Sequence, residues 1–74
     1  MTVYQLTPKE LYVTYMQEKD PAEVIQESRN DLATRLRVDE GLTQEEAYHA
    51  ADQILAYARD LVEAGESGSP APAS

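Results

Sequence analysis

The sequence predicts an all-α protein, a small three-helix hairpin or bundle with a disordered C-terminal tail. Three stretches have a Thr or Asp followed three residues later by Glu, which is the pattern of a helix N-terminus. Apolar residues recur with helical spacing after these stretches. We therefore expect one helical domain over residues 1–65, with helices of about 8–19, 21–39 and 44–64, followed by the tail 66–74.

The first predicted helix begins at a complete capping box. Residues 7–10 read Thr-Pro-Lys-Glu, with proline at the favoured first helical position, and Leu6 and Leu11 are spaced to form a hydrophobic staple. Pro21 disfavours helical geometry at the residue before it. We therefore expect this helix to end near residue 19.

The second and third predicted helices have similar starts. Residues 20–23 read Asp-Pro-Ala-Glu, and residues 43–46 read Thr-Gln-Glu-Glu. Gly41 suits the left-handed position that follows a helix C-terminus, so it separates the two helices. Beyond residue 65, the Ser-, Gly- and Pro-rich composition of the tail cannot bury enough surface to fold.

The longest predicted helix has an apolar seam that should face the core. Its members are spaced by three or four residues and are mostly alanines, namely Ala47, Ala51, Ile54, Ala58 and Leu61. Small side chains allow another helix to approach closely. We expect the 21–39 helix to be that neighbour, with Ile25, Leu32 and Leu36 facing the seam.

The short first helix has more apolar surface than one buried face requires. Its apolar residues include the candidate interface anchors Leu11, Tyr12, Tyr15 and Met16. A chain of 74 residues is marginal in core size, so we expect a homo-oligomer, most simply a dimer through this helix and part of the second predicted helix. The alternative is that the tyrosines are boundary residues, with the ring inside and the hydroxyl in water.

Negative charge gathers in the second half of the chain. The whole chain has 14 acidic and 6 basic residues, and Arg59 is the single basic residue among residues 39–74. The candidate partner-binding acids of the third helix are Glu45, Glu46, Asp52, Asp60 and Glu63. They form either a solvated face that keeps the protein soluble or a surface that docks on a basic groove, with nucleic-acid mimicry as a special case.

Basic residues concentrate in the second predicted helix. Arg29 lies at the edge of its core face, so we expect its stem to pack there and its head to pair with an acid of the 44–64 helix. An alternative is that Arg29 and a symmetry mate bind an anion. Asp31 and Arg35 have the spacing of an ordinary ion pair within a helix.

The sequence argues against an enzyme. Cysteine is absent, the three glycines form no phosphate-binding loop, and His49 is the single histidine. Glu45, His49 and Asp52 have one-turn spacing, but without a second histidine they are a poor metal site. We therefore expect no cofactor and no bound metal.

These observations together predict a small acidic, non-enzymatic protein-binding regulator or inhibitor that blocks a basic surface of a partner protein. The alternatives are an oligomeric anion- or small-ligand-binding protein that uses Arg29, and a structural assembly adaptor. The net charge of −8 disfavours direct binding to nucleic acid, and we expect a cytoplasmic protein without membrane association. By analogy with small acidic inhibitors, a phage or mobile-element origin stays open.

Overall fold

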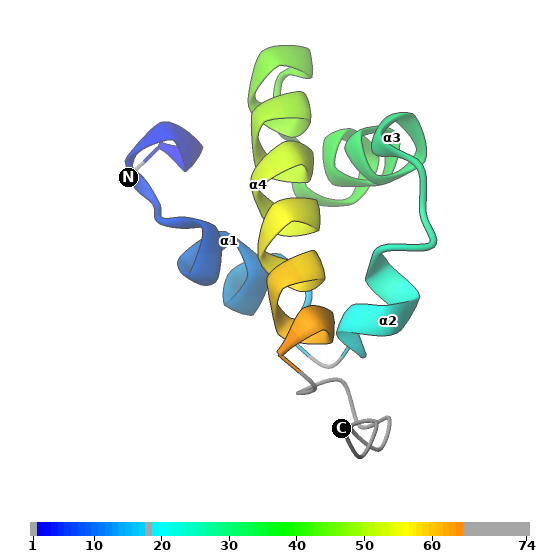
Figure 1. The fold of residues 1–74 in the computed structure, drawn as a ribbon. Coiled ribbons are helices and arrows are strands. Elements are labelled where there is room, and N and C mark those ends of the chain that lie inside the picture. Colours follow the sequence, from blue (N-terminus) through cyan, green and yellow to red (C-terminus); the bar gives the residue numbers. More distant parts are fainter. Residues whose placement is uncertain (1, 18, 65–74) are drawn as a thin grey trace.

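The computed structural model describes residues 2–17 and 19–64, which are entirely helices and their connections. The elements are a 3₁₀ turn η1 (Val3–Gln5), followed by α1 (Pro8–Tyr15), α2 (Pro21–Val24), α3 (Arg29–Glu40) and α4 (Gln44–Glu63) (Figure 1). The predicted all-α class is thus confirmed. The tail predicted over 66–74 lies outside the described residues.

The two threonine capping boxes form as predicted. The Thr7 hydroxyl accepts a hydrogen bond from the Glu10 amide at 3.2 Å, and the Glu10 carboxylate accepts one from the Thr7 amide at 3.1 Å. Thr43 and Glu46 repeat this arrangement with the same two distances. These reciprocal bonds satisfy backbone donors that a helix start otherwise leaves unpaired, and they fix the first residues of α1 and α4.

The segment predicted as one helix over 21–39 is divided in two. Ser28 has an extended backbone (ψ 158°), and its hydroxyl caps α3 by accepting from the Asp31 amide at 3.1 Å. The helical spacing predicted that Arg35 pairs with Asp31. In the structure, Arg35 pairs instead with Glu27 in the connection between α2 and α3. A serine cap and this ion pair therefore stabilise a corner where the sequence pattern indicated a continuous helix.

Helix α1 is shorter than the predicted 8–19 because the chain leaves helical geometry at Met16, where φ is −125°. The Tyr12 hydroxyl donates to the backbone oxygen of Lys19 at 2.6 Å, which holds the following loop against the helix. Asp20 then caps α2 by accepting from the Ala22 amide at 3.0 Å. At the far end of α3, Gly41 takes the expected left-handed conformation with φ 71°.

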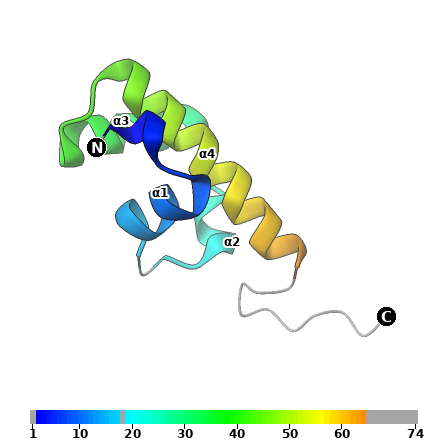
Figure 2. The same cartoon turned by 90° about the vertical axis from the view of Figure 1, so that its left-hand side faces the viewer.

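Helix α4 is the element on which η1, α1, α2 and α3 all pack. In Figure 1, α1 lies on one side of α4 and α2 and α3 lie on the other, and Figure 2 shows α4 along one edge of the fold. The predicted seam is buried, with its alanines and Ile54 fully covered and Leu61 partly covered. Leu32 and Leu36 of α3 are buried as predicted, and Ile25 is partly buried.

Candidate functional site on the outer face of α4

The four predicted interface anchors of α1 are mostly core residues. Leu11, Tyr12 and Met16 are only 0%, 8% and 2% exposed within the chain itself, and Tyr15 is half-buried. The Tyr12 ring packs against the Tyr57 ring of α4, with 5.3 Å between centroids. This finding corrects the prediction for Leu11, Tyr12 and Met16, because the chain itself covers the side chains that a second chain was expected to cover.

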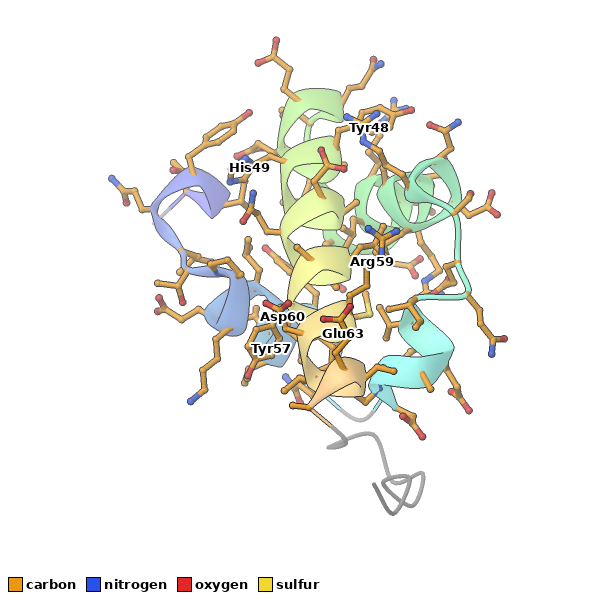
Figure 3. All side chains as sticks on the ribbon, viewed as in Figure 1. Tyr48, His49, Tyr57, Arg59, Asp60 and Glu63 are labelled. Carbon is orange, nitrogen blue, oxygen red and sulfur yellow. The ribbon has the colours of Figure 1, made fainter. Side chains whose placement is uncertain are left out.

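The acidic residues of α4 divide into two groups. Glu45, Asp52, Asp60 and Glu63 are exposed on the side opposite the buried seam, and the last two lie on the face turned toward the viewer in Figure 3. Glu46 differs, because it is half-buried and its carboxylate caps the helix by accepting from the Thr43 amide. We define the acidic face as the four exposed acids, which extend over roughly 27 Å of helix.

Basic and aromatic side chains lie next to the four acids of the acidic face. Figure 3 shows Arg59 beside Glu63 on the same side of α4, with Tyr48 and His49 nearer the start of the helix. Both halves of the face are therefore of mixed charge, because Arg59 lies near Glu63 and Arg29 of α3 pairs with Asp52.

A hollow adjoins the N-terminal half of the acidic face. It has a volume of about 840 Å³, is open to solvent, and is lined by Arg29, Thr43, Gln44, Glu45, Tyr48, His49 and Asp52. Pockets for small molecules are mostly apolar and enclosed, whereas this one is open and its lining is about as polar as it is apolar. Several of these residues were predicted separately from the sequence, but no sequence pattern indicated that they and Tyr48 form one site.

Arg29 pairs with an acid of α4, as predicted. Its Nε donates to Oδ1 of Asp52 at 2.6 Å, and its guanidinium lies over the Tyr48 ring at 4.4 Å from the centroid. The Tyr48 hydroxyl donates to Oδ1 of Asn30 at 2.8 Å, which fixes the ring. The hollow thus has one guanidinium against the carboxylates of Asp52 and Glu45. This balance of charge disfavours the alternative in which Arg29 binds an anion.

His49 contacts the N-terminal segment. Its ring lies 4.9 Å from that of Tyr4 between centroids, tilted by 54°, and the neighbouring Val3 anchors η1 in the core. Loss of solvent and the nearby negative charges of Glu45 and Glu46 raise the pKa of Tyr4 above its ordinary value. His49 is therefore engaged with an aromatic partner on the side facing η1.

The hollow can recognise a cation, because the carboxylates of Glu45 and Asp52 line it together with the aromatic ring of Tyr48. Within residues 2–17 and 19–64, no group of three acidic or histidine side chains is placed to hold a metal ion.

No helix in the same part of the chain has the length and apolarity needed to cross a membrane. The chain has no significant match among protein-family models, curated proteins or solved structures.

Proposed function

We propose that this protein is a non-enzymatic regulator that binds a partner protein through the acidic face of α4 and blocks a basic surface of that partner. The observation that supports the proposal is the separation of the two sides of α4. One side supplies the buried seam, and the other presents Glu45, Asp52, Asp60 and Glu63 to solvent. Because these acids contribute little to the core, the helix can present charge without losing stability.

A basic protein surface is the partner that fits this charge distribution. The net charge of −8 repels phosphate backbones and anionic lipids but attracts clusters of Lys and Arg. Electrostatic complementarity of this kind mainly accelerates association and sets specificity. Where the partner's basic surface normally binds nucleic acid, the bound regulator excludes it, and nucleic acid then competes with the regulator for the partner.

The test compares two variants with the same change in charge. The acidic-face variant carries Glu45→Gln, Asp52→Asn, Asp60→Asn and Glu63→Gln. The control variant carries four neutral substitutions of exposed acids on α2 and α3, namely Glu23→Gln, Asp31→Asn, Asp39→Asn and Glu40→Gln. Circular dichroism first checks that both variants fold as the wild type does.

Partners captured from a host lysate by the wild type are then measured by surface plasmon resonance against all three proteins. We expect the acidic-face variant to associate about tenfold or more slowly at low salt, with a much smaller effect from the control variant. High salt should remove most of the difference. Equal effects of the two variants would show that net charge acts without regard to position, and the proposal would fail.

A homodimer remains a separate prediction. The burial of Leu11, Tyr12 and Met16 removes most of the surface on which it was based, and Val13 and Tyr15 are the α1 residues that still offer apolar surface. Docking of the acidic face requires a single chain only. Sedimentation equilibrium at micromolar concentration tests the dimer, and a mass of 8.2 kDa would exclude it.

A further inference from the structure

The hollow beside α4 already holds a guanidinium that belongs to the chain itself. Arg29 lies over the face of Tyr48, and its Nε meets Asp52 at 2.6 Å. A planar cation stacked on an aromatic ring with a carboxylate at its edge is a common way in which proteins bind arginine. The hollow therefore has the chemistry of an arginine-binding site, and Arg29 shows where the group lies.

Arg29 is weakly held in this position. Its side chain is 55% exposed and that of Asp52 is 47% exposed, and a single nitrogen of the guanidinium makes the contact. Exposed ion pairs of this type contribute little to stability. Arg29 is also the first residue of α3, where the positive end of the helix dipole disfavours a cation. These features allow the side chain to leave without disrupting the fold.

The hollow keeps its negative charge when Arg29 leaves. Glu45 and Asp52 are seven residues apart on the same side of α4, which places them roughly 10 Å apart along the helix axis. Tyr48 lies between them in sequence, and its ring remains fixed by Asn30. Two carboxylates and a fixed ring then face a hollow of about 840 Å³ that is open to an incoming side chain.

We propose that an arginine of the partner protein enters this hollow and takes the place of Arg29 between Tyr48 and Asp52. Arg29 is an internal competitor that covers the site in the free protein. The inference rests on the proposed function, because it specifies which group of the basic partner the acidic face recognises. The inference predicts that removal of Arg29 strengthens binding of the partner. Loss of one positive charge anywhere on the protein also strengthens this binding, but it accounts for only part of the predicted effect.

The experiment measures binding of a fluorescently labelled, end-blocked oligoarginine peptide by anisotropy at low salt. Arg29→Gln is compared with Arg37→Gln, which removes the same charge from an exposed position on α3 away from the hollow. We expect Arg29→Gln to lower Kd about two- to sixfold more than Arg37→Gln does, the factor expected when a weak internal ion pair no longer competes. Equal changes in the two variants would overturn the inference.

Nuclear magnetic resonance gives a second measurement that does not depend on affinity. During titration of the wild type with the peptide, the Nε–H signal of Arg29 and the ring signals of Tyr48 should shift together. If the peptide binds while the Arg29 signal stays unchanged, exchange does not occur and the inference is wrong.

The two proposals fail in different ways in these experiments. In one outcome, the acidic-face variant loses peptide binding but the Arg29 signal of the wild type does not shift during the titration. The proposed function then stands, and the exchange of Arg29 is wrong. If the wild type and the acidic-face variant bind the peptide equally, or neither binds it, both proposals are wrong.

Discussion

Substitution of Ser28 by alanine tests the corner between α2 and α3, because the two descriptions of this segment predict effects of opposite sign. In the structure, Ser28 is an N-cap whose hydroxyl accepts from the Asp31 amide at 3.1 Å. In a continuous helix over 21–39, the same residue would occupy an interior helical position.

The size of the expected effect follows from the geometry. Loss of a serine cap typically costs about 1 kcal/mol, and water can reach the freed amide because Ser28 is exposed. For a domain of this size, 1 kcal/mol corresponds to a fall in Tm of about 4–8 °C. In a helix interior, alanine is instead favoured over serine by about 0.5 kcal/mol, so Tm would rise by a few degrees.

Urea denaturation followed by circular dichroism measures the free energy of unfolding of the wild type, Ser28→Ala and the control Ser28→Asp. Aspartate also caps helices and is favoured by the helix dipole, so the control should match or exceed the wild type in stability. A stabilising effect of Ser28→Ala would refute the corner and restore a continuous helix.

Two further predictions concern the core. Leu32→Ala removes a fully buried side chain of α3 and should cost about 2–5 kcal/mol by urea denaturation, whereas Val38→Ala, at a position 76% exposed on the same helix, should change stability by less than about 0.5 kcal/mol. Burial is the main cause that raises the pKa of Tyr12, and the charge of Asp20 is the next. The neutral Tyr12 side chain therefore contributes its full stabilisation below pH 10, the ordinary tyrosine pKa. This contribution is lost as pH rises through the pKa of the folded state. Tyr12→Phe should cost about 0.5–1.5 kcal/mol at neutral pH, because it loses the hydrogen bond to Lys19. Its denaturation midpoint should also fall less than that of the wild type when the pH is made alkaline. An equal fall in the two proteins would contradict this role of Tyr12.

Local signals in the sequence predicted the starts of α1, α2 and α4 and the buried face of α4. Capping boxes depend on residues three positions apart, and the seam depends on helical periodicity, so both can be read without knowledge of the tertiary structure. The pairing of Arg29 with α4 was predictable for a similar reason, because it lies at the edge of the α3 core face. The start of α3 also had a local signal, since Ser28 precedes Asp31 by three residues, but the apolar pattern running through 21–39 outweighed it.

Tertiary contacts decided what the sequence could not predict. Tyr12 is buried because the Tyr57 ring and the loop at Lys19 both meet it, and no periodic pattern within residues 8–19 indicates those partners. The hollow depends in the same way on Arg29 and Tyr48 meeting across two helices. Residues of one candidate site were thus visible in the sequence, whereas their grouping required the fold.

The position of α4 in the chain has a consequence for synthesis on the ribosome. The elements that precede α4 pack mainly on it and only slightly on one another. Isolated helices as short as α1 and α2 are marginal in water. The N-terminal segments must therefore remain largely unfolded until residues 44–63 have left the exit tunnel. The whole domain then folds in one late step, and apolar residues such as Leu11 and Leu32 stay exposed to chaperones and proteases until that moment.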